Sequence, residues 1–350
     1  MIEIAKGNLL ELDVEALVNT VNCDGFMGKG IALQFKKAFP ENNDAYARAC
    51  RAKEMQVGKM HVFETGLIVN PRFIINFPTK RHWRGPSRLD DIDTGLNALI
   101  KEVSKLDIKS IAIPPLGCGL GGLDWRIVRP KIEKAFAKLP EVKIMLFEPV
   151  GTPDAKNMPV RTKRPKMTIA RALLIKLMQR YAKLAYRLTL LEIQKLAYFL
   201  QESGEPLRLK YEAGPYGPYA HNLNKVLEVL DGHFMTGYGD TQKPDVEIEL
   251  LPGSVREADE FIIAHKNSIN RLNKVADLIE GFQTPYGIEL LSSVHWLVHH
   301  GDSRARDVTD AISLIKKWTD RKRRMFHPDH IQIAWKQLSD KMWLSEMGSR

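Results

Sequence analysis

The chain has 350 residues, 44% of them hydrophobic and 27% charged, which is typical of a soluble globular protein long enough for two domains. Its only cysteines, Cys23, Cys50 and Cys118, lack Cys-x-x-Cys spacing, so a disulfide framework or a structural zinc is not expected and a reducing cytoplasm is. There is no bilayer-length apolar run and no signal-peptide pattern, and the net charge of +10 fits either a polyanionic partner or an ordinary basic surface.

Residues 1–150 alternate short apolar runs with helical patterns, which predicts an α/β domain with a central sheet and helices on both faces. The predicted strands are Met1–Ala5, Ala16–Asn22, His61–Thr65, Phe73–Phe77, Ser110–Pro114 and Lys143–Glu148. The predicted helices are Ile31–Phe39, Glu41–Arg51, Leu89–Leu106 and Ile127–Ala137. In such domains ligands bind where loops leave the carboxyl ends of strands.

Glycine-rich loops follow two of these strands. The first, in ALVNTVNCDGFMGKGIALQF, places Asn19 and Asn22 before glycines at 25, 28 and 30, and then a helix begins. The second, in IAIPPLGCGLGGLDW, has glycines at 117, 119, 121 and 122. Glycines before a helix let backbone N–H groups approach a phosphate, although a plain strand–turn–helix connection is the alternative for either loop alone. Two such loops in one small domain favour a ligand site, and Cys118 is expected to pack under the second loop rather than act as a thiolate.

The segment NFPTKRHWRGPSRL follows the strand Phe73–Phe77 and interleaves basic side chains with Trp83. Single-stranded nucleic acid is bound in this way, by phosphate pairing and base stacking. The alternative is a solvated loop with Trp83 packed on the domain.

Taken together, GNLLEL, the two glycine loops and their order resemble a macrodomain, a module that binds ADP-ribose. The resemblance implies that Asn22 contacts the distal ribose, and that the loop after Asp24 wraps the diphosphate. Asn8 stands where macrodomains usually carry an aspartate that accepts a hydrogen bond from adenine; an asparagine carbonyl can accept it without charge assistance. The implied ADP-ribose contacts are Asn8, Leu9, Asn19, Asn22, Gly28, Lys29, Gly30, Ile31, Thr79, Gly117, Cys118, Gly119, Leu120, Gly121, Gly122 and Leu123.

The NFPTK motif with a downstream GCG loop resembles the macrodomain branch that removes ADP-ribose from carboxylates and DNA, which includes the DarG antitoxins of DarT toxins. DarT attaches ADP-ribose to thymine in single-stranded DNA. The resemblance implies that Lys80 is catalytic, either as a nucleophile whose pKa is lowered by Arg81, Arg84 or burial, or as a cation that assists the departing thymine. Arg81, Trp83 and Arg84 would contact DNA, and no cofactor or metal is implied.

One feature departs from the relatives that act on carboxylates. At the position of Gly121 the resemblance implies that those relatives carry an aspartate, which resolves a lysine-bound intermediate. Asp124 is the nearest carboxylate here, and a helix N-cap is the favoured role for it. His82 is either an acid–base group or a surface residue.

Residues 151–166 read as a basic, proline-containing linker, and residues 167–350 as a mainly α-helical domain. A short strand is expected at Val246–Leu251. His295, His299 and His300 are expected to be packing or surface residues rather than metal ligands. The predicted helices are Ile169–Leu188, Thr189–Gln201, Asn222–Leu230, Val255–Phe282, Tyr286–His299, Val308–Trp318 and Pro328–Leu338.

The KLAYFLQ helix and the GPYGPY turn resemble a Panacea-type antitoxin domain, which implies that residues 167–350 bind and occlude the toxin. Tyr211, Tyr216 and Tyr219 would serve as interface anchors, or pack between helices. The leading hypothesis is therefore a DNA ADP-ribosyl glycohydrolase fused to a toxin-binding domain. A protein or metabolite ADP-ribosyl hydrolase and a non-catalytic ADP-ribose reader are the alternatives.

Overall fold

The computed structural model describes residues 1–149, 158–183, 188–239, 247–301 and 303–344. The chain forms two compact units. Of the described residues, the first contains Met1–Arg164 and Gly239, and the second contains the others from Pro165 onward. Each unit has hydrophobic clusters of its own, so each is described by itself. Residues 150–157, at the predicted start of the linker, lie outside the described residues.

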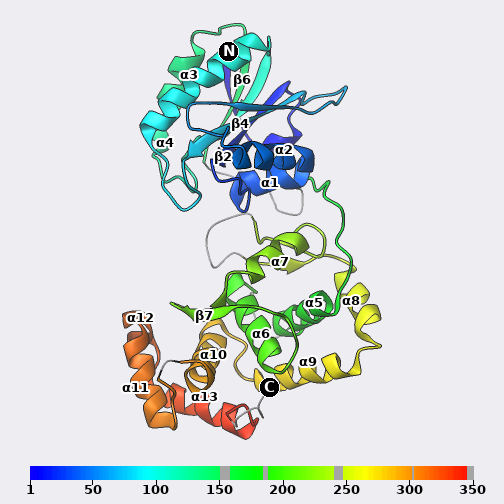
Figure 1. The fold of residues 1–350 in the computed structure, drawn as a ribbon, viewed down its shortest axis with the longest axis vertical. Coiled ribbons are helices and arrows are strands. Elements are labelled where there is room, and N and C mark those ends of the chain that lie inside the picture. The colour runs from blue at the N-terminus through cyan, green and yellow to red at the C-terminus, as the bar shows by residue number, and fades with distance from the viewer. Residues whose placement is uncertain (150–157, 184–187, 240–246, 302, 345–350) are drawn as a thin grey trace. The chain divides into compact units, whose positions relative to one another are not determined.

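The first unit is built on a six-stranded mixed sheet in the order β1-β6-β5-β2-β4-β3 (Figure 1). Only β3 runs antiparallel to its neighbour. This confirms the predicted α/β class and five of the strands to within a residue at either end. The strands are β1 (Ile2–Ala5), β2 (Ala16–Asn22), β3 (His61–Glu64), β4 (Phe73–Lys80), β5 (Ser110–Ile113) and β6 (Lys143–Phe147).

Helices cover both faces of this sheet because successive strand residues point to opposite sides. Val18 and Ile75 pack in one cluster with apolar residues of α3 and α4, whereas Leu17 and Ile74 pack in another with Phe35 of α1. The helices agree with the predicted ones to within two residues. They are α1 (Gly30–Ala38), α2 (Pro40–Arg51), α3 (Leu89–Lys105) and α4 (Trp125–Phe136).

Strand β4 runs to Lys80, three residues beyond its predicted end at Phe77. Pro78 has no N–H to donate, and the pairing of β2 with β4 shifts by one residue next to it. As a result Asn22 is in register with Lys80 rather than with Thr79. The irregularity places the end of one glycine-loop strand beside the predicted catalytic lysine.

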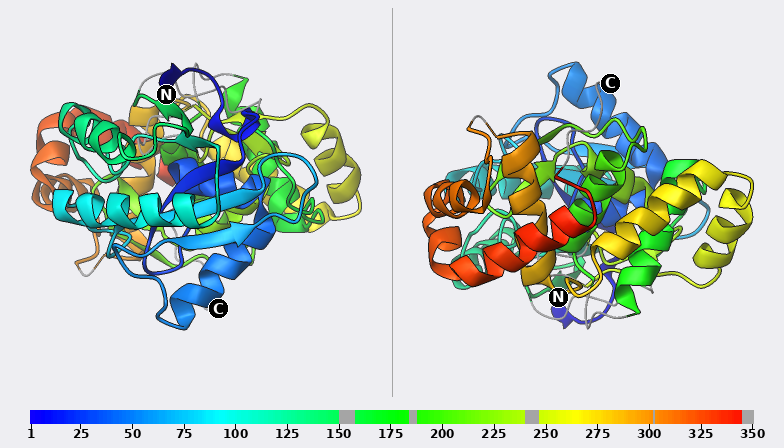
Figure 2. Two further views of the ribbon diagram at one scale, coloured as in Figure 1. Left: turned by 90° about the horizontal axis from the view of Figure 1, so that it is seen from above. Right: turned by 90° about the horizontal axis from the view of Figure 1, so that it is seen from below.

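The second unit is mainly helical, as predicted, and its two most buried helices contact each other. These are α6 (Leu190–Glu202), which starts with a capping box at Thr189, and α10 (Pro285–His299). Around them lie α5 (Ile169–Ala182), α7 (Leu223–Leu230), α8 (Ser254–Ile262), α9 (Lys266–Leu278), α11 (Val308–Trp318), α12 (Asp320–Met325) and α13 (Pro328–Asp340). The C-terminal ends of α9 and α13 meet, as Figure 2 shows from below, and Gln337 Nε2 donates to Leu278 O at 2.9 Å.

The single helix predicted over Val255–Phe282 is wrong, because the structure divides it into α8 and α9. Both pack against α5, which is about 21 Å long, whereas one straight helix over the whole span would be about 42 Å long. The break lets both apolar faces reach the same short helix. Helix α12 was not predicted, and residues 184–187 and Val246, at the ends of two predicted elements, lie outside the described residues.

The GPYGPY turn closes a two-stranded antiparallel hairpin, β7 (Tyr211–Gly214) and β8 (Gly217–Ala220), which was not predicted as strands. A second small ribbon pairs β9 (Met235–Thr236) with β10 (Glu249–Leu250). Strand β10 lies within the predicted strand Val246–Leu251. No helix among the described residues combines the length and apolar character needed to cross a membrane.

Candidate functional site

Three loops leave the same edge of the first unit's sheet. β4, β2 and β5 are neighbouring parallel strands, so their carboxyl ends lie side by side. The first glycine loop follows β2, the basic segment from Arg81 onward follows β4, and the second glycine loop follows β5. This edge is where a parallel sheet offers a binding site.

Asn22 fixes the shape of the first glycine loop. Its Nδ2 donates to Phe26 O at 2.7 Å, and its Oδ1 accepts from Asp24 N at 2.9 Å. The hydroxyl of Tyr46 donates to the same Oδ1 at 3.1 Å. A side chain added at Gly28 would meet nothing within 4 Å, so the backbone there is open to a ligand.

Asn19 is not part of this open edge. It is fully buried, and its Nδ2 donates to Asn76 Oδ1 at 2.9 Å in an amide cluster that includes Asn42. Leu9 and Thr79 are also buried. These three predicted contacts are thus buried, whereas Gly28, Lys29, Gly30 and Ile31 lie at the start of α1.

The second glycine loop leaves no room for a side chain at position 121. A Cβ added to Gly121 would lie 2.2 Å from Ser87 Oγ and 2.3 Å from Gly117 O. Ser87 N also donates to Gly121 O at 3.0 Å, and its buried hydroxyl has no hydrogen-bond partner. Ser87 was not singled out from the sequence, since a lone serine carries no pattern. The packing therefore requires glycine at position 121.

Lys80 joins the three loops. Its Nζ donates to Leu120 O, and the Leu120 side chain would lie 3.7 Å from a Cβ added at Gly30. Burial lowers the pKa of the Lys80 ammonium. The predicted catalytic lysine and both glycine loops are thus brought together.

Arg81 is not the cause of that shift. Its guanidinium forms a bidentate pair with the buried carboxylate of Asp91, at 2.8 and 3.1 Å. Of the causes considered from the sequence, burial is the one that acts on Lys80. The Arg81 guanidinium is thus paired with a carboxylate, whereas that of Arg84 lies over the Trp83 ring.

The rest of the basic loop is tied to the first glycine loop by Asp24. Its carboxylate accepts from Trp83 N at 2.8 Å and lies 3.8 Å from His82 Nε2. Trp83 is 46% exposed and Phe26 59%, and the centroids of their rings are 6.2 Å apart. The Arg84 guanidinium lies over the Trp83 ring at 4.5 Å. Trp83 is therefore displayed rather than packed on the domain, and Phe26 joins it although no sequence pattern indicated it.

Two weaker candidates have structural roles. Asp124 is the N-cap of α4, and its carboxylate accepts from Arg126 N at 2.9 Å and from the Arg126 guanidinium, which lowers the pKa of Asp124. Burial raises the pKa of Cys118 to about 11, so its thiol stays protonated at neutral pH.

Asn8 caps a short 3₁₀ turn, Leu9–Glu11, by accepting from Leu10 N at 3.0 Å through Oδ1. Its Nδ2 is buried and has no partner. The oxygen that was expected to accept from adenine is thus already used once, and the remaining group is a donor.

In the second unit, only one of the three highlighted tyrosines is displayed. Tyr211 OH donates to Gln194 O at 3.3 Å, and Tyr219 OH accepts from Asn224 Nδ2 at 2.8 Å. Tyr216, at the tip of the hairpin, is 43% exposed and lies 4.4 Å from the Arg321 guanidinium.

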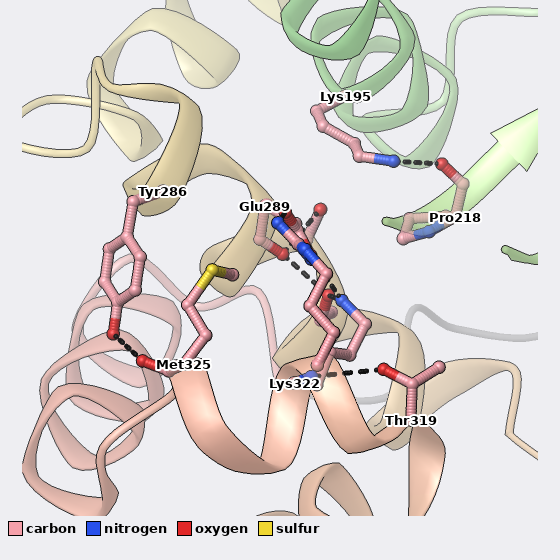
Figure 3. Close-up of polar contacts among 10 residues, drawn as sticks. Lys195, Pro218, Tyr286, Glu289, Thr319, Lys322 and Met325 are labelled. Atoms are coloured by element: carbon pink, nitrogen blue, oxygen red, sulfur yellow. Dashed lines mark hydrogen bonds and ion pairs between the residues drawn. The ribbon is translucent and has the colours of Figure 1, made fainter. Parts of the chain in front are cut away.

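The hairpin rests on buried charged groups (Figure 3). Lys195 Nζ donates to Pro218 O at 2.6 Å, while Lys322 Nζ donates to Glu289 Oε1 at 2.7 Å. Arg321 adds a bidentate pair with Glu289 at 2.7 and 2.9 Å. Burial, with a further contribution from the charge of Lys322, lowers the pKa of Lys195 to about 7. Lys195 therefore holds the hairpin backbone near Tyr216, and the Arg321 guanidinium lies over the Tyr216 ring.

The three histidines of α10 and its end differ in burial, since His295 is buried, His299 is half-buried and His300 is exposed. His295 Nδ1 lies 2.7 Å from Tyr198 OH, His299 Nε2 lies 2.8 Å from Trp343 O, and His300 Nε2 lies 3.0 Å from Glu202. Across the described part of the chain, no group of histidine, cysteine or carboxylate side chains is arranged to hold a metal.

The chain is similar to several known proteins. The Macro domain family model matches residues 18–132. A DNA ADP-ribosyl glycohydrolase of Thermus aquaticus is 45% identical, over 95% of this chain and 92% of its own length. A DNA ADP-ribosyl transferase–DNA ADP-ribosyl glycohydrolase fusion protein of Thermosipho africanus is 33% identical over 45% of each chain. The solved macrodomain of Mycobacterium tuberculosis DarG is 53% identical over 43% of this chain and 99% of that structure, with a TM-score of 0.43.

Proposed function

The chain belongs to the DarG family of DNA ADP-ribosyl glycohydrolases, and from this premise we propose that it removes ADP-ribose from thymine bases of single-stranded DNA. The observation that carries the proposal is Lys80, which contacts the second glycine loop and begins the loop that displays Trp83 and Arg84. The glycine loops would hold the diphosphate, Asn22 would adjoin the distal ribose, and the displayed aromatic and basic side chains would hold the DNA.

The reaction breaks the bond between the anomeric carbon of the distal ribose and the thymine nitrogen. Water supplies the hydroxyl to that carbon, and the bonding electron pair leaves with thymine, which takes up a proton. We assign Lys80 the role of proton donor and cation beside the departing base. Burial lowers the pKa of Lys80, which brings proton donation nearer to neutral pH.

The surroundings of Lys80 favour this role over nucleophilic attack. A lysine–ribose adduct needs a group that resolves it, and the resemblance to the carboxylate-directed branch implies a carboxylate at the position of Gly121 for that role. No side chain fits there, and the carboxylate of Asp124 is paired with Arg126. The ammonium already donates to Leu120 O, which is the behaviour of a hydrogen-bond donor.

Lys80→Ala tests this proposal. With an oligonucleotide ADP-ribosylated on thymine, the wild type should release ADP-ribose, and Lys80→Ala should be slower by about 100-fold or more. No release by the wild type, or equal release by both, would overturn the assignment. Release from an ADP-ribosylated peptide but not from the oligonucleotide would support a protein-directed hydrolase, and binding without release from either would support a reader.

We further propose that residues 167–350 bind and inhibit the cognate DarT transferase. The support is Tyr216, an exposed aromatic ring on a turn whose backbone is held by Lys195, because rigid aromatic side chains make good interface anchors. The fused Thermosipho africanus relative also shows a transferase and a glycohydrolase combined in one protein.

Tyr216→Ala should weaken transferase binding about 10-fold or more in a calorimetric titration. Phe261→Ala, on α8, removes another partly exposed aromatic ring, 38% exposed, and should leave binding unchanged. Equal affinity of the wild type and Tyr216→Ala would exclude the hairpin tip as a contact with the transferase. No binding by the wild type would exclude the transferase as a partner.

A further inference from the structure

Phe26 and Trp83 stand out among the exposed side chains of the first unit. They are large aromatic rings from different loops, both about half exposed, and they contact each other edge to face. Exposed apolar groups that gather in one place usually mark a binding surface. Neither ring is needed for the core, since neither belongs to a hydrophobic cluster of the unit.

Hydrogen bonds between side chains and the backbone hold the two aromatic residues in place. The Asp24 carboxylate accepts from Trp83 N, while Asp24 N donates to Asn22 Oδ1. Asn22 Nδ2 also donates to Phe26 O at 2.7 Å. One hydrogen-bonded chain therefore connects the proposed ribose contact to both aromatic residues.

Charge favours a nucleic acid on this surface. Arg84 lies over the Trp83 ring and is itself exposed, and the His82 ring stacks on Trp83 with centroids 6.0 Å apart. The Asp24 carboxylate is the opposing charge here, and it is occupied by Trp83 N and by its proximity to His82. An aromatic pair with a guanidinium beside it is suited to bases and phosphates of a single strand.

We infer that Phe26 and Trp83 form an aromatic platform on which a nucleobase next to the ADP-ribosylated one stacks. The inference rests on the proposed function, because the modified base is joined to the distal ribose. Lys80 acts at that ribose, and Trp83 lies three residues beyond Lys80 on the loop that leaves β4. The strand on either side of the modified base must therefore pass close to the basic loop.

The platform predicts an effect that depends on substrate length. Phe26→Ala and Trp83→Ala should each lower kcat/KM about 10-fold for an ADP-ribosylated oligonucleotide, the size expected from one lost stacking contact. The same variants should change kcat/KM for ADP-ribosylated thymidine and the affinity for free ADP-ribose less than twofold. Phe26→Tyr and Trp83→Phe keep a ring and should recover most of the loss.

Ile68→Ala is the matched control, because Ile68 is a fully exposed apolar side chain in the loop between β3 and β4. It should behave as wild type with both substrates. If the alanine variants lower activity equally on the oligonucleotide and on the nucleoside, or on neither, the platform is rejected even when the wild type is active.

Binding of an unmodified single-stranded oligonucleotide, followed by fluorescence anisotropy, separates this inference from the proposed chemistry. Weaker binding by Phe26→Ala and Trp83→Ala supports the platform even if the wild type releases no ADP-ribose, which would overturn the hydrolase alone. Unchanged binding together with unchanged kcat/KM overturns the platform alone.

Discussion

Gly121 and Gly119 are two residues apart in the second glycine loop and differ in what surrounds them. A Cβ at Gly121 would overlap Ser87 Oγ and Gly117 O, whereas one at Gly119 would meet nothing within 4 Å. Gly121→Ala should displace the loop, remove Leu120 O from Lys80 and destabilise the chain by about 1–3 kcal/mol. Gly119→Ala should be close to neutral. Thermal unfolding and ADP-ribose release measure both effects, and equal behaviour of the two variants would contradict the packing described for Ser87.

Asn8 offers a change that should improve binding. Its buried Nδ2 has no partner, whereas its Oδ1 caps the turn at Leu10. Asn8→Asp keeps the cap, removes the unpaired donor and adds a charge-assisted acceptor for the adenine amino group. We expect ADP-ribose to bind several-fold more tightly by calorimetry. Asn8→Ala should lose about 1 kcal/mol of stability with the cap, and tighter binding by this variant would refute the explanation.

The sequence was informative wherever a residue type is rarely used without a reason. The glycines of both loops and Lys80 in NFPTK pointed to the edge at which the structure gathers them. Ser87 and Phe26 could not be found in this way, because their importance comes from neighbours more than 30 residues away in Gly121 and Trp83. Asn19 shows the reverse case, because a polar residue near a strand end is here a buried structural group.

At the level of elements, helix α6 carries a buried lysine with an unusual consequence for stability. Burial lowers the pKa of Lys195 to about 7, against an ordinary value of 10.5. Between these values the unfolded chain holds a proton that the folded chain has released, so stability rises with pH over this range. Below pH 7 both states hold the proton, and the folded state is destabilised by the full free-energy cost of burying the Lys195 ammonium.

Lys195→Met removes that charge. We expect the variant to be more stable than wild type by about 1–4 kcal/mol below pH 7, with an advantage that shrinks as the pH approaches 10. Denaturant unfolding of the full chain at several pH values measures the difference. An advantage that stays constant with pH would mean that Lys195 is buried without a shifted pKa. Lys322 is not a substitute control, because it is paired with Glu289.

Element boundaries were predictable where local signals mark them and not where packing sets them. Asp124 and Thr189 cap their helices, and the sequence placed α4 and α6 within two residues of where they begin. The division of α8 from α9 depends on α5, and the extension of β4 to Lys80 depends on its pairing with β2. Neither can be read from the segment itself.

For the whole molecule, the two units have separate cores, and we expect them to act separately. The hydrophobic cluster of the second unit contains only residues from 167 onward, and those of the first contain none beyond Met158. A fragment of residues 1–166 should keep the hydrolase activity, and one of residues 167–350 should bind the transferase and protect cells that express it. Loss of activity in the first fragment, or failure of the second to protect, would show that the proposed domains depend on each other.

The contact of Lys80 with Leu120 O affects how fast the proposed enzyme can turn over. The Leu120 side chain lies near the start of α1 at Gly30, and the Leu120 carbonyl accepts from the Lys80 ammonium. We therefore expect a diphosphate to move the two glycine loops apart as it enters. After the bond to the base has been cleaved, both loops would still hold the ADP-ribose product. We therefore expect loop opening and product release, rather than bond cleavage, to limit kcat. The first turnover would then be faster than those that follow, giving a burst of unmodified oligonucleotide equal to the enzyme concentration.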